Sequence, residues 1–288
     1  MAEKIYASTG TMVSRFNGFD YVTALRELEK LESDGACDGI ELMMLKFYYD
    51  MKDSVINEIR SRKITVGTIH CEKDVGEILG DAGAQLAEGN SQAERELREE
   101  ALKLFRLNCW FGHELGVGRM VLHLWGGFSS DRHIEYNVGM LPELSEIASG
   151  YGLRILVENI PSQVYDPRRN WRRTLPNLGN GGFVFDTRFG NLHKQMEGIL
   201  LDRALAEKIE HVHISDFAGT YRQFFRLRPV QHPWEGHVDF DRFAGLLRFI
   251  GYRNTVTIES SVVDPADGSV DPEKLRHTLI YIRQLLDF

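Results

Sequence analysis

Cysteine is scarce in this sequence of 288 residues. Its three cysteines, Cys37, Cys71 and Cys109, lie far apart and form no CxxC pair. This distribution excludes a small domain stapled by disulfides. An odd number of dispersed cysteines is typical of a reducing compartment, so we expect a cytoplasmic protein.

Positive charge and long apolar runs are also limited. Lys and Arg number 34 against 42 Asp and Glu, which gives a formal net charge of −8. Proteins that bind duplex nucleic acid usually carry a basic excess, so nucleic acid is not an expected partner. No apolar run approaches the roughly 18 residues of a membrane span, and the N-terminal MAEKIYASTGT lacks the apolar stretch of a signal peptide. We therefore expect neither a membrane span nor a signal peptide.

Several common catalytic motifs are missing as well. The first expected strand–helix turn has no GxGxxG, and neither GxxxxGK(S/T) nor GxSxG occurs. His113-Glu114 lacks the second histidine of HExxH. Cys71 follows His70, but adjacent residues of a strand face opposite sides, which argues against a thiol–imidazole pair.

What the sequence does contain is a repeated pattern of short apolar runs separated by amphipathic stretches. The runs are rich in Val, Ile and aromatic residues and apolar nearly throughout, as is typical of strands buried on both faces. The expected strands are Lys4–Ser8, Asp38–Leu42, Ile64–His70, Arg119–Leu124, Leu153–Asn159, Gly182–Asp186, His211–Asp216 and Thr255–Ser260.

Helical spacing of apolar residues marks the stretches between these runs. The clearest expected helices are Tyr21–Glu32, Gln92–Leu115, Asp241–Ile250 and Leu275–Leu286. Eight strands alternating with helices predict an α/β fold, a (β/α)8 TIM barrel that spans residues 1–288 as a single domain. A doubly wound open sheet is the alternative, and the missing GxGxxG argues against it.

Polar residues occur near the end of almost every expected strand. They are Glu41, His70, His123, Glu158, Asp186, His213 and Glu259. In a barrel the carboxyl ends of the strands meet at one face, so these side chains are predicted to converge. Burying several carboxylates without a cation is costly, which favours a bound divalent metal. Mixed carboxylate and imidazole ligands suit manganese, magnesium, cobalt, iron or zinc.

The sequence resembles a known family, the xylose-isomerase-like barrels, over nearly its whole length and most strongly from Arg119 onward. These include sugar isomerases and epimerases and, more distantly, endonuclease IV. The segments that carry the resemblance stand in the family's order and spacing. They are RMVLHLWGG (119–127), ILVENIP, GFVFDTRFGN, EHVHISD, HPWEGHVDF and TVTIES.

The resemblance implies a ligand set and a catalytic pair. In the ketose epimerases of this family one divalent metal, with manganese preferred and magnesium, cobalt or zinc possible, is held at positions that match Glu158, Asp186, His213 and Glu259. The two glutamates, Glu158 and Glu259, also serve as the acid–base pair in such enzymes. The further residues expected to contact substrate are His70, His123, Trp125 and Arg222.

Three positions depart from the family pattern. Phe189 stands where the family has the histidine of DxxH, and Trp234 replaces the first glycine of its PxGxGxVDF loop. Arg228-Pro229-Val230 occupies the place of the DxH found in the nucleases, so a trinuclear zinc cluster is incomplete. A DNA-repair endonuclease is therefore the less favoured interpretation.

The predicted function is a metal-dependent isomerase or epimerase of a sugar or sugar derivative, working through an enediolate. A metal-dependent lyase, like the dehydroshikimate dehydratases or C-glycoside-cleaving enzymes, is the alternative, and Phe189 favours it. A member of the family without catalytic activity is a third interpretation. The expected partner is a small carbohydrate, with no membrane, and family members are often homo-oligomers.

Arginine is concentrated in two segments expected to overhang the pocket. Residues 161–181 hold Arg168, Arg169, Arg172 and Arg173, and residues 217–237 hold Arg222, Arg226 and Arg228. The planar guanidinium binds carboxylate or phosphate in bidentate fashion. These arginines are expected either to contact an anionic substrate group or to pair with acidic residues of the surface or a neighbouring subunit.

Overall fold

Eight parallel strands close into a barrel in the computed structural model, which describes residues 3–126, 130–218 and 231–286. The strands are β1 (Lys4–Ser8), β2 (Ile40–Met43), β3 (Val66–His70), β4 (Arg119–Leu122), β5 (Arg154–Glu158), β6 (Gly182–Asp186), β7 (Ile209–Ile214) and β8 (Thr255–Ile258). They pair in chain order, and β1 pairs with β8 to close the ring. The predicted barrel is confirmed and the open sheet is excluded.

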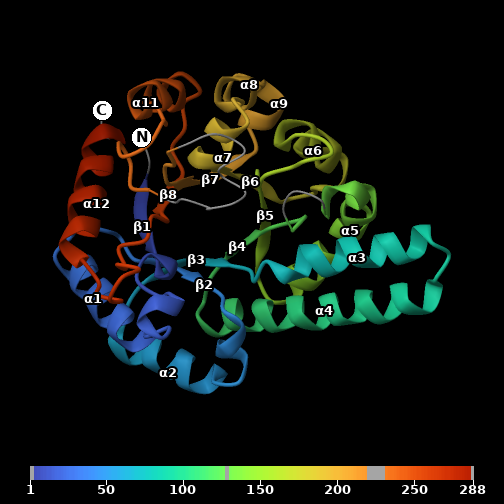
Figure 1. Cartoon of the computed structure of the whole chain (residues 1–288), viewed down its shortest axis with the longest axis horizontal. Coiled ribbons are helices and arrows are strands. Elements are labelled where there is room, and N and C mark those ends of the chain that lie inside the picture. The colour runs from blue at the N-terminus through green and yellow to red at the C-terminus, as the bar shows by residue number, and fades with distance from the viewer. Residues whose placement is uncertain (1–2, 127–129, 219–230, 287–288) are drawn as a thin grey trace.

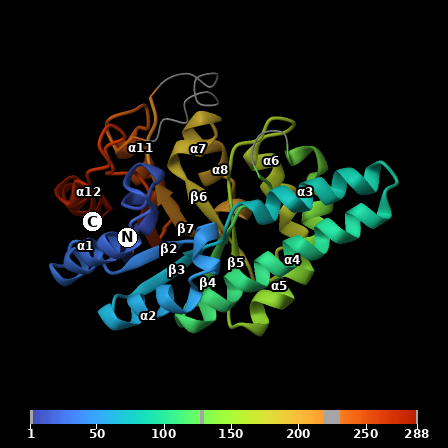
Figure 2. The same cartoon turned by 60° about the horizontal axis from the view of Figure 1, so that its bottom comes forward.

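Helices surround the barrel (Figures 1 and 2). The α-helices are α1 (Tyr21–Ser33), α2 (Lys52–Arg62), α3 (Asp74–Ala87), α4 (Ser91–Glu114), α5 (Ile134–Gly150), α6 (Pro167–Thr174), α7 (Thr187–Leu192), α8 (Met196–Leu200), α9 (Arg203–Ala206), α11 (Phe240–Phe249) and α12 (Pro272–Leu286). Short 3-10 turns lie at η1 (Thr9–Thr11), η2 (Arg15–Asn17), η3 (Lys46–Tyr49), η4 (Ser130–His133) and η5 (Leu175–Asn177). The four helices expected from the sequence are all present, within three residues of their predicted bounds.

The second and third strands begin two residues later than predicted. The predicted strands include residues 38–39 and 64–65, but Gly39 has a φ of +135°. This backbone geometry precedes the regular ladder, which starts at the pair Ile40–Val66.

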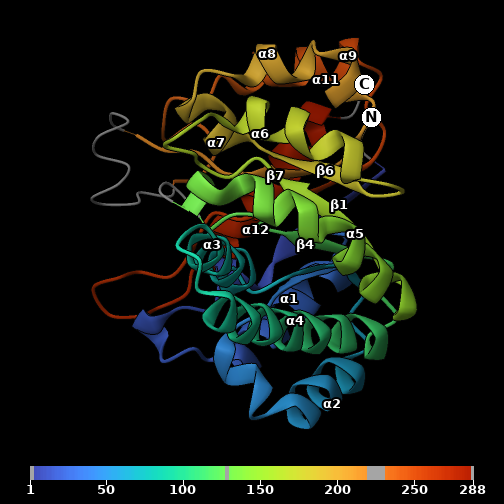
Figure 3. The ribbon, with the colours of Figure 1, turned by 90° about the vertical axis from the view of Figure 1, so that its right-hand side faces the viewer.

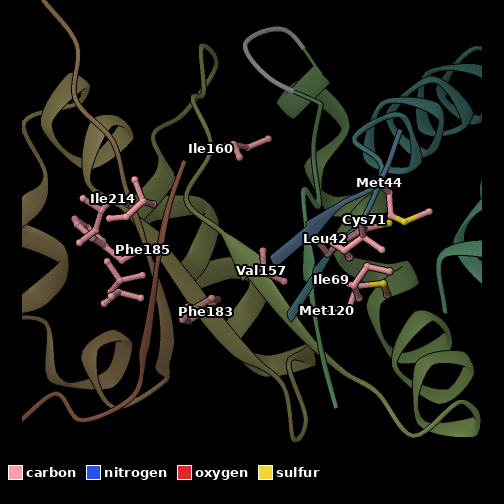
Figure 4. Close-up of a cluster of buried hydrophobic side chains, with 14 of the residues drawn as sticks. Leu42, Met44, Ile69, Cys71, Met120, Val157, Ile160, Phe183, Phe185 and Ile214 are labelled. Carbon is pink, nitrogen blue, oxygen red and sulfur yellow. The ribbon is translucent and has the colours of Figure 1, made fainter. Parts of the chain in front are cut away.

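Alternation along the strands divides their side chains between two environments. Outward-facing residues such as Val157, Phe185 and Ile214 are fully buried against the helices and belong to the main hydrophobic core (Figure 4). Inside the barrel, Val121 and Leu156 join Val184 in a separate small apolar cluster. Successive side chains of a strand point to opposite faces, so residues two positions further along β5 and β6 also point inward. That parity brings Glu158 and Asp186 to the axis.

Two consecutive helices follow β3 and lie beside each other outside the barrel. Figure 1 shows α3 and α4 projecting to one side, and Figure 3 looks at the molecule from that side. Neither they nor any other helix in the described ranges is long and apolar enough to cross a membrane.

Candidate metal centre

Four side chains from neighbouring strands meet at the carboxyl end of the barrel. They are Glu158 at the end of β5, Asp186 at the end of β6, His213 near the end of β7 and Glu259 directly after β8. One ligand atom from each lies within 4.8 Å of the others. Three of the side chains are at most 1% exposed, and that of Glu259 is 8% exposed. The structure thus brings together the four residues that the sequence singled out as metal ligands.

His213 stands between the two glutamates of this group. Its Nδ1 atom lies 3.0 Å from Glu158 Oε1 and 3.4 Å from Glu259 Oε1. Burial by itself would lower the pKa of His213, but the carboxylates of Glu259, Glu41 and Glu158 raise it well above its ordinary value. In the metal-free protein, a proton on Nδ1 therefore faces the carboxylates of Glu158 and Glu259, which a bound cation would contact instead.

Hydrogen bonds hold both the side chain and the backbone of Asp186 in place. Its Oδ1 atom accepts a hydrogen bond from the Phe189 N–H, 2.9 Å, and so caps α7. The Asn159 side chain accepts from Asp186 N at 2.6 Å and donates to Asp186 O at 3.2 Å. These bonds aim the second carboxylate oxygen, Oδ2, into the centre of the site.

Two buried carboxylate oxygens in the site lack a hydrogen-bond partner among the described residues, Asp186 Oδ2 and Glu259 Oε1. Burial raises the pKa of Asp186 to about 6 and that of Glu259 to about 7. Burying acceptors without a donor is costly, and a cation removes that cost. Three carboxylates and one imidazole fit a divalent ion such as manganese, cobalt or zinc.

Glu158 presents its other oxygen to a pair of histidines. His123 Nε2 lies 2.6 Å and His70 Nε2 lies 3.5 Å from Glu158 Oε2. Burial opposes ionisation of Glu158, but His213 and His123 outweigh it and hold the pKa of Glu158 well below its usual range. His70 is held in place by its Nδ1 atom, which donates to Cys71 O at 3.0 Å. Both histidines lie beside the four-residue group and line the pocket, and their contact with substrate stays a prediction.

A pocket opens over this group. Its described lining is Met43, Met44, Leu45, His70, Cys71, Glu72, Lys73, His123, Glu158, Arg188, Phe189 and Glu259. Glu72, Lys73 and Arg188 were not predicted from the sequence. Arg188 could have been identified from the sequence, because it lies two residues after Asp186 in the segment GFVFDTRFGN. Its guanidinium stacks on Phe189, 4.5 Å from the ring centroid, and lies 3.8 Å from Asp186 Oδ2.

Two residues expected to contact substrate, Trp125 and Arg222, are not found in the described pocket lining. Trp125 is fully buried, donates its indole N–H to Pro161 O at 3.0 Å, and does not line the pocket among the described residues. β4 ends at Leu122, so strand alternation does not direct the Trp125 side chain, which packs in the core instead. Arg222 lies outside the described residues, as do Arg226 and residues 228–230.

The arginines of the first overhanging segment have acidic or aromatic partners. Arg168 and Arg172 both pair with Asp202. Arg173 pairs with Glu135 at 2.8 Å and stacks on Tyr165, and Arg169 lies over the same ring. These contacts give α6 a structural anchor, which is the second of the two roles expected for these residues.

Asp216, which follows β7, organises the glycine-containing loop. Its carboxylate accepts hydrogen bonds from the backbone N–H groups of Phe217, Gly236, His237 and Val238 at 2.7–3.0 Å. A Cβ atom at Gly236 would lie 2.3 Å from Asp216 Oδ1, so only glycine fits there. Trp234, which replaces the family glycine, has a φ of +72°, so the left-handed backbone conformation is present although a tryptophan adopts it.

Strand β7 carries a second buried histidine, His211, which was not predicted from the sequence. It stands two residues before His213 on β7, so it shares the inward face. The presence of two polar residues two positions apart on one strand could have identified it.

Comparisons with known proteins agree with the barrel fold. The model of one family, described as xylose isomerase-like TIM barrel, matches residues 28–285. Inosose isomerase of Bacillus licheniformis is 32% identical over 133 residues, which are 43% of this chain and 45% of that protein. The chain spans about half the length of the curated relatives that it matches.

Solved structures resemble the chain over nearly its whole length. D-allulose 3-epimerase from Methylomonas sp. superposes with a TM-score of 0.70 at 17% identity and covers 99% of this chain and 100% of its own. The IOLI protein with a bound zinc atom gives a TM-score of 0.68 at 18% identity, covering 98% of each chain. At these identities the likeness shows the fold.

Proposed function

The chain belongs to the xylose isomerase-like TIM barrel family, and we propose from this premise that it is a divalent-metal-dependent isomerase or epimerase of a sugar or sugar derivative. The observation that carries the proposal is the convergence of Glu158, Asp186, His213 and Glu259 in one buried group. The relatives named D-allulose 3-epimerase and inosose isomerase support a polyhydroxylated carbohydrate as the substrate.

The four residues would hold the metal through three carboxylates and His213 Nδ1. Manganese is our preferred ion, and the zinc atom of the IOLI protein supports zinc as another. When bound, the cation would polarise the substrate carbonyl and stabilise the negative charge that develops as the neighbouring proton leaves.

Glu158 and Glu259 would move the proton. Glu158 is held ionised by its histidine neighbours and is the group ready to accept a proton. Glu259, whose pKa burial raises to about 7 in the metal-free protein, has a higher proton affinity than Glu158 and would return the proton. Return to the opposite face of the same carbon gives an epimer, and return to the neighbouring carbon gives the aldose or ketose isomer.

The polar residues of the pocket wall would orient the substrate. His70 and His123 face the Glu158 oxygen that points away from His213. We add Arg188, whose guanidinium forms part of the wall beside Asp186, as a donor to substrate oxygens. Arg222 remains a proposed contact.

Phe189 supports one alternative, a lyase. Its ring lines the pocket next to Asp186, where related epimerases are expected to place a polar histidine. A lyase would use the same proton removal and then expel a leaving group from the carbon beyond the new anion.

Incubation with manganese and a panel of ketoses and inososes in deuterated water tests these alternatives. An isomerase or epimerase incorporates deuterium and returns an intact isomer, whereas a lyase gives an unsaturated product of lower mass. Asp186→Ala is the matched control and should lose the exchange. If wild type gives neither exchange nor product with any substrate of the panel, the proposal fails.

A further inference from the structure

A second buried polar cluster lies on the far side of the His213 ring from the metal ligands. It consists of Glu41 on β2, His211 on β7, and Thr255 and Thr257 on β8, all of them at most 5% exposed. Glu41 is at its centre and is fully buried. Strand alternation directs all four side chains into the barrel, below the level of Glu158 and Glu259.

Glu41 contacts both histidines of β7. Its Oε2 atom lies 3.2 Å from His211 Nε2 and 3.3 Å from His213 Nε2. A glutamate carboxylate is ordinarily ionised near neutral pH, and the hydrogen-bond partners of Glu41 are these two imidazoles. An ionised carboxylate only accepts hydrogen bonds, and therefore His213 Nε2 must carry the hydrogen that joins them.

This bond decides which nitrogen of His213 can bind a metal. With the hydrogen on Nε2, a neutral imidazole keeps its lone pair on Nδ1. Nδ1 is the atom that faces Glu158 Oε1 at 3.0 Å and Glu259 Oε1 at 3.4 Å. The two sides of the ring therefore have separate tasks, donation to Glu41 and a lone pair toward the ligand group.

We propose that Glu41 is a positioning residue, which fixes the tautomer and the orientation of His213 so that Nδ1 points at the metal. The inference rests on the metal site of the proposed function and adds a residue outside its four ligands. Ligand histidines commonly donate their second N–H to a carboxylate in this way, and the acceptor strengthens the ligand.

Glu41 is itself held in place by the neighbouring side chains. The His211 ring is fully buried and is enclosed by side chains of β2 and β8. Its Nδ1 atom lies 2.6 Å from Thr255 Oγ1, and its Nε2 atom lies 2.9 Å from Thr257 Oγ1 and faces Glu41. The ring is therefore fixed from two strands, and the carboxylate has a fixed neighbour on the side away from His213.

Glu41→Gln tests the proposal because it keeps the size of the side chain and removes its charge. Zn²⁺ alone is the probe, and its dissociation constant is measured by competition with a chelator of known affinity. We expect binding to weaken by about 10- to 100-fold, the usual effect of losing such a partner. Affinity within threefold of wild type would overturn the proposal.

Tyr252→Phe is the matched control. It removes another buried hydrogen bond, from the Tyr252 hydroxyl to the backbone oxygen of Thr255 at 2.6 Å, where β8 begins, and leaves the side chains around Glu41 unchanged. This variant should lower the melting temperature while leaving the zinc affinity within threefold of wild type. An equal loss of affinity in both variants would show a general effect of weakening the barrel and would contradict a role specific to Glu41.

Nitrogen NMR of the wild-type histidines decides the question even if Glu41→Gln does not fold. With zinc bound, His213 should show a protonated Nε2 and a metal-bound Nδ1; the reverse assignment would overturn the proposal. Different results would contradict the metal site and the positioning role of Glu41. Wild type without zinc affinity removes the metal site and with it the proposed function, whereas normal affinity in Glu41→Gln removes the positioning role alone.

Discussion

At the scale of single residues, the two proposed catalytic glutamates differ in their surroundings. Glu158 faces three histidines, whereas Glu259 has one oxygen without a hydrogen-bond partner among the described residues. Their pKa values are accordingly moved in opposite directions, downward for Glu158 and upward to about 7 for Glu259. Such a separation is what an acid–base pair needs near neutral pH.

Replacing Glu259 should therefore affect catalysis far more than stability. Glu259→Gln keeps the shape of the side chain and removes proton transfer, so kcat should fall by about 10²- to 10⁴-fold. Glu210→Gln is the control, since Glu210 lies on β7 but pairs with Arg154 away from the pocket. Steady-state kinetics on a substrate found in the ketose panel measure both; near-normal kcat in Glu259→Gln would exclude Glu259 from proton transfer.

The raised pKa values also predict how pH acts on the metal-free protein. Asp186 and Glu259 have ordinary pKa values of 3.8 and 4.5, and burial raises these to about 6 and about 7 in the folded state. The stability linked to these two groups is fully present below the ordinary values and is lost as the pH rises through about 6 to 7. Metal binding compensates the charges that form.

Manganese should therefore raise the melting temperature by more at about pH 8 than at about pH 5. Thermal melts with and without manganese, after treatment with a chelator, measure this difference at each pH. Asp186→Asn combined with Glu259→Gln should flatten the dependence. An increment that is equal at both pH values would contradict competition between metal and protons.

The position of Arg188 in the pocket wall predicts that it contributes to substrate binding. Loss of a charged hydrogen bond costs about 1.5–3 kcal/mol, so Arg188→Met should lower kcat/KM by about 10- to 100-fold, mainly through KM. Arg173→Met is the control, because Arg173 pairs with Glu135 and stacks on Tyr165. Equal KM values for wild type and Arg188→Met would return Arg188 to the role of a counter-ion for Asp186.

At the scale of elements, periodicity determined what could be predicted. The four proposed ligands lie at or next to strand ends, where a spacing of two residues decides which side chains face the axis. The same rule accounts for His211, which is two residues before His213 and was overlooked because only strand ends were considered. The rule does not predict the direction of the Trp125 side chain, since β4 ends at Leu122 and side-chain directions beyond the strand depend on tertiary packing.

Loops were the least predictable elements. Arg168 and Arg172 were candidates for an anion site, but their partner Asp202 is some 30 residues away in sequence and lies just before α9. Contacts over such separations leave no local pattern. The loop after β7 was more tractable where glycine had a specific task, as Gly236 does beside Asp216.

Gly236→Ala should consequently destabilise the protein. The added Cβ would meet Asp216 Oδ1 and Phe217 O, each at 2.3 Å, so the loop must shift, at a cost of about 1–3 kcal/mol. Gly245→Ala in α11 is the control: it meets nothing within 4 Å and should stabilise the helix by about 0.5–1 kcal/mol. Urea unfolding measures both; an unchanged midpoint for Gly236→Ala would show that the loop accommodates the methyl group.

At the scale of the whole molecule, the closed barrel explains why residues far apart in sequence share one site. Glu41 and His213 are separated by 172 positions and yet lie in hydrogen-bond contact. Parallel strands in chain order place all carboxyl ends at the same face, and closure of the ring through β1 and β8 brings β2 near β7. The alternation of strands and helices was sufficient to predict this architecture, whereas the lining of the pocket depended on side chains beyond the strands.

Metal analysis of wild type and Asp186→Ala is the most direct test of the proposed centre. Asp186 supplies a buried oxygen, Oδ2, that has no hydrogen-bond partner among the residues described and lies 3.8 Å from the Arg188 guanidinium, so its removal deletes a ligand without breaking a hydrogen bond of Oδ2. Wild type should bind one divalent ion per chain, and Asp186→Ala should bind it at least about 100-fold more weakly. Stoichiometric metal and full activity in Asp186→Ala would contradict the assignment of Glu158, Asp186, His213 and Glu259 as the metal site.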